Sequence, residues 1–367
     1  MSAKQINSAD RSPVLRKHAE DYLLIMLLCF AASVSGTRLF LELTGYPQLG
    51  SGELHIAHVL WGGLCLYIAC LFPIIFANRW AFYWSSALTG IGIGLFIDEV
   101  GKFITSENDY FYPAAAPIIY ALFILSVLLF TFIKNSLSER NSRAKFYDVL
   151  QTLEEIVDRD LSQAEYQALM ESLSHIAQHA PNESVSLLVR QLADNIPGYK
   201  LLIVEEKLPP IKKIINWLKK IESLYFTRRR NHAVISGGLF AWGVWAISYP
   251  LSVIVKIRSP QELQAFLSDL VSDQLIRGTS GLTWFQIRIG LEGGIGIIII
   301  ISAFLLLLRK EKIGIPLAIS ATLMSISIIN LLIFYFDQFS TIIVAAFQFV
   351  LLLLLIRYRN RFLNATA

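Results

Sequence analysis

Charged residues are scarce in this sequence. They make up 16% of the chain, whereas a soluble globular protein carries roughly a quarter. Hydrophobic residues make up 54% of the 367 positions. So few charges cannot cover a soluble fold of this size, and the composition therefore places the chain in the membrane class.

Cysteine and recognisable site motifs are also rare. The three cysteines, Cys29, Cys65 and Cys70, all lie in apolar runs, and no CxxC pair or His/Cys finger spacing occurs. This pattern excludes a disulfide framework and a structural zinc site as interpretations of the sequence. No glycine-rich nucleotide loop and no nucleic-acid motif is present, so a nucleic-acid partner is not expected. No duplicated half of the kind that many transporters carry is visible.

Long apolar runs, in contrast, are abundant, and each approaches the ~20 residues that a membrane helix needs. They predict an all-α polytopic membrane protein with about eight spans, at 22–43, 55–77, 80–104, 113–134, 232–257, 284–308, 313–336 and 338–356. Basic residues before the first run also fit a cleaved signal peptide. An uncleaved span is preferred because the apolar pattern continues through Leu43.

The distribution of basic residues predicts the topology. Arg and Lys lie in the N-terminal tail, in the 78–79 turn with Arg79, before residue 231, in the 309–312 turn and in the C-terminal tail. The 44–54 and 105–112 loops and the turn around Asp337 have none. Basic loops remain on the cytoplasmic side, so both termini and the 135–231 insert are expected to be cytoplasmic. The basic residues of the 258–283 loop fit this topology least well.

These features predict three regions, namely membrane segments 1–134 and 232–367 around a helical insert at 135–231. Ser162 and Glu165 form a capping-box pattern that indicates a helix start within the insert. After Pro209 and Pro210, apolar residues share one helix face and lysines lie mostly off that face, as in an interfacial helix, although a helix docked on its neighbours fits equally well. A further amphipathic helix is predicted in the outer loop at 259–277.

Ionisable residues inside the spans are the main functional signal, because charges in a bilayer are costly. Several share a helix face with small residues, which let helices approach closely. This spacing predicts one buried polar cluster in the outer half of the membrane region, formed by Arg38, Glu42, His55, His58, Asp98, Glu99 and Lys102, with Arg288 and Glu292 as possible additions.

Three interpretations of this cluster are open. His55, His58 and Asp98 are candidate ligands of a divalent metal, because two histidines and a carboxylate form a known catalytic zinc site. Histidine beside carboxylates also suits a proton or substrate pathway. Finally, the i,i+4 spacings of Arg38 with Glu42, of Asp98 with Lys102 and of Arg288 with Glu292 can form ion pairs that only fix the helices.

Two sequence blocks carry a resemblance to known proteins. The run TRLFLELTGYPQLGSGELHIAHVLWGG and the run GIGLFIDEVGKFITSENDYF, both within residues 36–112, contain HxxHxxWG and DExGK patterns. They resemble a group of uncharacterised bacterial polytopic integral membrane proteins. The resemblance implies a bacterial inner-membrane location and brings no activity with it.

The sequence therefore favours a membrane protein that binds or passes a small ligand, ion or proton through a buried His/carboxylate site. A metal-dependent membrane enzyme acting on lipid or envelope substrates is the alternative. A scaffold that binds a cytoplasmic protein through residues 135–231 is a third hypothesis. The sequence leaves open whether the protein is an enzyme.

Overall fold

We analysed a computed structural model of the chain. It describes residues 13–45, 57–106, 112–136, 142–159, 161–179, 183–198, 227–256 and 278–363, with a few single positions between 203 and 220 and between 259 and 268. His55 and most of the two predicted amphipathic helices, after Pro210 and at 259–277, lie outside the described residues.

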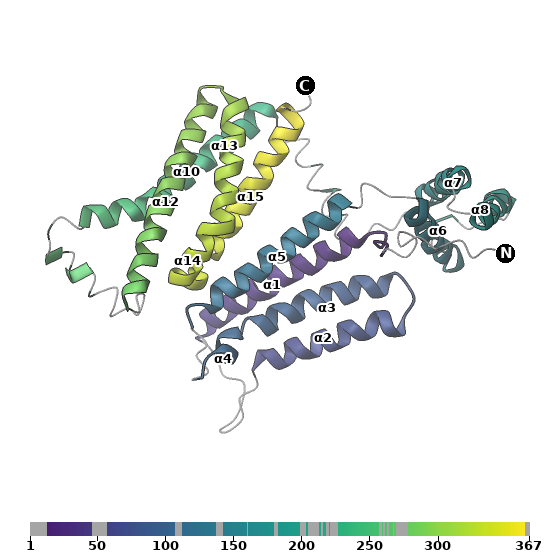
Figure 1. Cartoon of the computed structure of the whole chain (residues 1–367), viewed down its shortest axis with the longest axis horizontal. Coiled ribbons are helices and arrows are strands. Elements are labelled where there is room, and N and C mark those ends of the chain that lie inside the picture. Colours follow the sequence, from purple (N-terminus) through teal and green to yellow (C-terminus); the bar gives the residue numbers. More distant parts are fainter. Residues whose placement is uncertain are drawn as a thin grey trace, which may run out of the picture. The chain divides into compact units, whose positions relative to one another are not determined.

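The prediction of an all-α polytopic protein is confirmed. In the described ranges, eight helices are long and apolar enough to cross a membrane, and all regular elements are helical. The spans begin and end close to the predicted positions (Figure 1): α1 (Ala19–Thr44), α2 (His58–Ile75), α3 (Trp80–Ile97), α5 (Ala115–Ser136), α10 (Arg228–Lys256), α12 (Gly278–Leu307), α13 (Glu311–Met324) continued by α14 (Asn330–Asp337), and α15 (Ile342–Tyr358).

Two of the spans are less regular than the apolar pattern predicts. The third predicted span, 80–104, is interrupted, because α3 ends at Ile97 and the short α4 (Val100–Ile104) follows. The seventh span contains a π-helix at Ser325–Ile329 between α13 and α14, where the amide of Asn330 donates to the Ser325 carbonyl. Hydrophobic periodicity does not distinguish these wider or broken turns from continuous helix.

Glycines bring the N-terminal helices into close contact. A Cβ atom at Gly90 would lie 2.2 Å from the Met26 carbonyl oxygen, and one at Gly94 would lie 2.6 Å from the Ser33 side chain, both on α1. On the other face of α3, Gly92 lies against Gly62 and Leu66 of α2. The predicted small-residue row of α3 therefore does pack against another helix.

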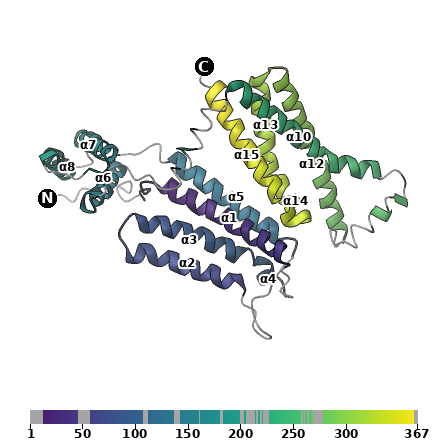
Figure 2. The ribbon, with the colours of Figure 1, turned by 180° about the vertical axis from the view of Figure 1, so that it is seen from behind.

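The C-terminal helices form their own bundle with the largest apolar core of the molecule's described part. Helices α10, α12, α13 and α15 lie side by side in both views (Figure 2). Gly243 of α10 and Gly296 of α12 face each other, and a Cβ at either position would meet the partner's carbonyl oxygen at 3.2 or 3.3 Å. This close approach lets α12 carry its polar residues into the bundle.

The insert contains α6 (Ser142–Val157), α7 (Gln163–Gln178) and α8 (Glu183–Asn195) around a small core that includes Leu173 and Ile176. The predicted capping box is present. The amide of Glu165 donates to Ser162 Oγ over 3.3 Å, and the amide of Ser162 donates to Glu165 Oε2 over 3.0 Å. The cap fixes where α7 begins.

Contacts divide the chain into two compact units. One contains 1–34, 56–95 and 125–214, and the other contains 35–55, 96–124 and 215–367. The division of the sequence into 1–134, 135–231 and 232–367 is a different one and stays a prediction.

The contact at Gly90 generates a test of the membrane packing. We expect Gly90→Ala to destabilise the protein by about 1–3 kcal/mol, because the added methyl group would overlap the α1 backbone. Gly63→Ala on α2 is the matched control, because a Cβ there meets nothing within 4 Å. Thermal unfolding in detergent measures both. Equal unfolding temperatures for the two variants would contradict the packing.

Candidate functional site

Arg38 and Asp98 form a buried ion pair at the ends of two helices. Arg38 lies on α1 and Asp98 directly follows α3, and their side chains are 7% and 0% exposed. Arg38 Nε donates to Asp98 Oδ1 over 2.5 Å, and Arg38 Nη2 donates to the Asp98 carbonyl oxygen over 3.0 Å. The guanidinium therefore donates hydrogen bonds to both the carboxylate and the backbone carbonyl of Asp98, at the point where α3 ends.

This pairing differs from the spacing-based prediction. Glu42, the expected i,i+4 partner of Arg38, is exposed, and Arg38 binds Asp98 of another helix. Lys102 donates to Glu99, three residues before it, over 3.3 Å. The reason is the end of α3, since Glu99 has φ −93° and ψ 11° and the i,i+4 register is lost there.

Charges of opposite sign are paired at this site. In the described residues, Arg38 pairs with Asp98, and Lys102 pairs with Glu99. Buried charges that neutralise each other in this way fit the interpretation of ion pairs that fix helices.

His58 is half-buried at the start of α2, within the other compact unit, and His55 lies outside the described residues. The metal site of His55, His58 and Asp98 therefore stays a prediction.

Arg288 forms a second buried centre, in the C-terminal bundle. Its Nη1 atom donates to Asp337 Oδ1 over 2.8 Å, and its Nη2 atom donates to Asp337 Oδ2. The guanidinium also lies 5.3 Å from the ring centre of Tyr249 and 5.5 Å from that of Phe336. Asp337 is not among the predicted site residues, although a single acid at the end of an apolar span is a signal that could identify it.

Glu292 is the second carboxylate at this centre. Glu292 Oε2 lies 3.6 Å from Arg288 Nε, yet neither atom makes a hydrogen bond within the described part of the chain. Glu292 is 5% exposed. One guanidinium, already bound by both oxygens of Asp337, thus faces an additional buried carboxylate.

A cavity continues from Glu292 into the bundle. It has a volume of about 10 Å³, which is about the space that one water molecule needs, and Ser325 and Gln348 also line it. Asn330 donates to Gln348 Oε1 over 2.7 Å and to the Tyr120 hydroxyl over 3.1 Å.

These polar residues surround the π-helix. The hydroxyl of Tyr120 donates to the carbonyl of Ile326, within Ser325–Ile329, over 2.7 Å. Asn330 and Gln348 are 3% and 1% exposed and were also missed from the sequence. Polar side chains within apolar spans are the signal that identifies them, because such groups need partners inside the bundle. Widened turns of this kind occur often at functional sites.

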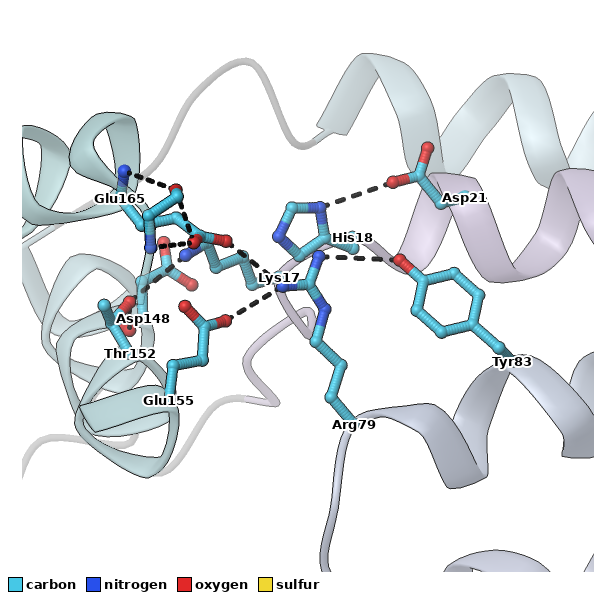
Figure 3. Close-up of polar contacts among 10 residues, drawn as sticks. Lys17, His18, Asp21, Arg79, Tyr83, Asp148, Thr152, Glu155 and Glu165 are labelled. Atoms are coloured by element: carbon cyan, nitrogen blue, oxygen red, sulfur yellow. Dashed lines mark hydrogen bonds and ion pairs between the residues drawn. The ribbon is translucent and has the colours of Figure 1, made fainter. Parts of the chain in front are cut away.

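The opposite end of the N-terminal helices binds the insert through Arg79, in the turn between α2 and α3 (Figure 3). Arg79 Nη1 donates to Glu155 over 2.9 Å and to Glu165 over 3.4 Å, and its Nη2 atom donates to the Tyr83 hydroxyl over 3.5 Å. Lys17 donates to Thr152 over 3.1 Å. The insert is therefore docked on the membrane helices by charge.

The two acids that bind Arg79 differ in their protonation behaviour. Burial, together with the charge of Glu165, raises the pKa of Glu155. Burial also acts to raise the pKa of Glu165, but hydrogen bonds from Ser162 and the charge of Arg79 outweigh it and lower that pKa below its ordinary value. Glu165 therefore stabilises docking when ionised, whereas ionised Glu155 carries a burial cost.

A His/carboxylate group is present where α1 begins, at the end that carries the insert. His18, Glu20 and Asp21 have ligand atoms within 4.8 Å of one another, and in the described ranges no other group of three such residues meets this criterion. His18 Nδ1 lies 3.3 Å from Asp21 Oδ2 (Figure 3). This group is distinct from the predicted metal ligands.

Comparisons with family models, with curated proteins and with solved structures found no match for this chain.

The Arg38–Asp98 pair generates a stability prediction. We expect Asp98→Asn to cost about 3 kcal/mol or more, because it removes the charge of a fully buried carboxylate to which Arg38 donates. Glu42→Gln should change stability by no more than about 0.5 kcal/mol, because Glu42 is exposed. Thermal unfolding of both variants and of the double variant Arg38→Gln/Asp98→Asn provides the check. Failure of the double variant to recover part of the loss would argue against a specific pair.

The docking contact generates a pH prediction. A lowered pKa means that ionised Glu165 stabilises the folded state above its unfolded pKa, and that this stability is lost as the pH falls through the lowered value. Glu165→Gln should therefore cost about 1 kcal/mol at pH 7 and progressively less below pH 5. Glu155→Gln should cost less at pH 7 than Glu165→Gln, because the burial of ionised Glu155 opposes its contact with Arg79. The unfolding midpoints of the variants and of the wild type, measured at pH 7 and at a pH below 5, check these expectations. A loss in Glu165→Gln that does not depend on pH would contradict them.

Proposed function

We propose that this protein is a multi-pass inner-membrane protein that binds and passes a proton or a small cation at Glu292. The observation that carries the proposal is the arrangement of two carboxylates around Arg288 within the described part of the chain. Asp337 accepts hydrogen bonds from both terminal nitrogens of the guanidinium, and Glu292 adds a second carboxylate, which is buried.

In the described residues, Glu292 shares the guanidinium of Arg288 with Asp337, and an ionised carboxylate pays a large desolvation cost in a low-dielectric interior. A proton or a small cation on Glu292 would offset that cost. Asp337 keeps Arg288 in place, so the guanidinium can remain fixed while the charge state of Glu292 changes. Asp337 is also 35% exposed at the end of α14, which gives the centre an opening to one side.

The polar groups beyond Glu292 supply oxygen atoms for the same ligand. Ser325 and Gln348 line the cavity with Glu292, and its volume suits a water molecule or a small ion rather than an organic substrate. Proton relays and ion paths in membrane proteins are built from such intramembrane carboxylates and polar side chains. The π-helix Ser325–Ile329, whose first residue lines this cavity, is a wider turn than an α-helix.

The location and orientation are part of the proposal. The resemblance of residues 36–112 to bacterial membrane proteins supports an inner-membrane address. The basic turn at Arg309 and Lys310 supports an orientation with that end of α12 in the cytoplasm and Arg288 toward the outer side. The insert, docked through Arg79, would then be cytoplasmic and accessible to a protein partner.

The test is ion flux in proteoliposomes. We expect the wild-type protein to pass protons, Na⁺ or K⁺ under an imposed membrane potential, and we expect Glu292→Gln to lower that flux at least about tenfold, because it removes the charge that binds the ion. Glu42→Gln, at an exposed carboxylate, is the matched control and should retain the flux.

Equal flux in Glu292→Gln and the wild type would reject the assignment of Glu292. Absence of flux for all three ions, with stoichiometric metal in the purified protein, would instead favour the metal-dependent enzyme. His18, Glu20 and Asp21 are then the described residues to examine first.

A further inference from the structure

The C-terminal bundle has a large pocket at the end remote from Arg288. It lies where α10 and α13 begin and where α12 ends, beside the short helix Arg359–Leu363 that follows α15. Its volume is about 920 Å³. Five cationic side chains line it, Arg228, Arg229, Arg309, Lys310 and Lys312, against the single carboxylate of Glu311. The pocket is therefore strongly positive and is large enough for a small ligand.

Several cationic side chains at this pocket lie at helix N-termini, where positive charge is unfavourable. Arg228 and Arg229 occupy the first turn of α10, and Lys312 occupies the first turn of α13. The N-terminus of a helix carries a partial positive charge and free N–H groups, so cations there destabilise the helix and anions stabilise it. An anion bound in this pocket would therefore stabilise the two helix N-termini and offset the cations beside them.

Arg309 has a backbone conformation that normally selects glycine. Its φ is +59°, in a turn where its amide donates to the Leu306 carbonyl over 2.8 Å and the Lys310 amide donates to the Leu305 carbonyl over 2.9 Å. Helices that end in this pattern usually have glycine at the left-handed position. An arginine at this position loses backbone stability but places a cation at the pocket.

Glu311 reduces the positive charge only in part. It accepts a hydrogen bond from Arg228 Nη2 over 2.9 Å and lies 3.9 Å from His232 Nε2. Arg229, Arg309, Lys310 and Lys312 are all exposed at this end of the bundle. Their side chains are thus accessible to a ligand from outside the protein.

We propose that this pocket binds the phosphate-bearing headgroup of an anionic phospholipid. Arginine and lysine together suit a phosphate group, because arginine offers paired N–H donors and lysine offers a compact charge. A lipid, rather than a soluble phosphate compound, is favoured by the apolar side chains of Ile313, Phe362 and Leu363 in the same wall. The pocket also lies where apolar spans end, which is the depth of lipid headgroups.

The experiment measures lipid binding to the full-length protein in neutral detergent. Native mass spectrometry and the rise in unfolding temperature are recorded with phosphatidylglycerol, with phosphatidylcholine and with glycerol 3-phosphate. We expect phosphatidylglycerol to bind and to raise the unfolding temperature, and we expect phosphatidylcholine and glycerol 3-phosphate to do so far less.

Two variants make the site assignment specific. Arg309→Gly with Lys312→Gln removes two cations, and we expect its affinity for phosphatidylglycerol to fall roughly 25-fold, at about fivefold per cation. Arg309→Gly alone should unfold no earlier than the wild type without lipid, because glycine suits the left-handed turn. This separates lost binding from lost folding. Lys134→Gln with Arg190→Gln removes two exposed cations elsewhere and should bind lipid like the wild type.

Equal losses of affinity in the pocket variant and in this control would overturn the site, as would equal binding of phosphatidylcholine. Binding of glycerol 3-phosphate as tight as that of phosphatidylglycerol would overturn the lipid assignment in favour of a soluble phosphate ligand.

Discussion

A charge inside a membrane protein has to be neutralised by the protein itself, because the hydrocarbon offers no water to solvate it. The two arginines that are buried in the described part of the chain obey this constraint in different ways. Arg38 is held by Asp98 through its side chain and backbone, and Lys102 binds the neighbouring Glu99. Arg288 is held by Asp337 and faces Glu292 as well. The first arrangement explains how helices are fixed, and the second leaves a group that can take part in binding.

Small residues decide where these charges meet. Gly90 and Gly94 let α3 approach α1 to backbone contact, and the same face of α3 leads on to Asp98. Gly243 and Gly296 do the same for α10 and α12, on which Glu292 lies one turn before Gly296. Close helix packing, charge pairing and the candidate site are thus consequences of one pattern, in which a small-residue stripe is followed by a polar residue on the same face.

The two ends of α12 carry opposite electrostatic characters. Near its beginning, one guanidinium faces two carboxylates, and at its end the pocket contains five cations and one carboxylate. The excess of cations at one end is the pattern that orients membrane proteins with that end in the cytoplasm. In the proposed orientation, the ion site opens outward and the lipid site faces the inner leaflet, where anionic headgroups and lysine or arginine attract each other.

The sequence alone determined the eight spans, the capped helix of the insert and the presence of costly charges within the membrane region, because these follow from apolar length, local spacing and composition. Tertiary structure decided the partners. Spacing along one helix indicated Glu42 for Arg38 and Glu292 for Arg288, yet the closest carboxylates are Asp98 and Asp337 on other elements. The polar network of Asn330, Gln348 and Tyr120 joins residues up to 210 positions apart. Such pairings depend on how helices pack in three dimensions, which the periodicity of a single span does not contain.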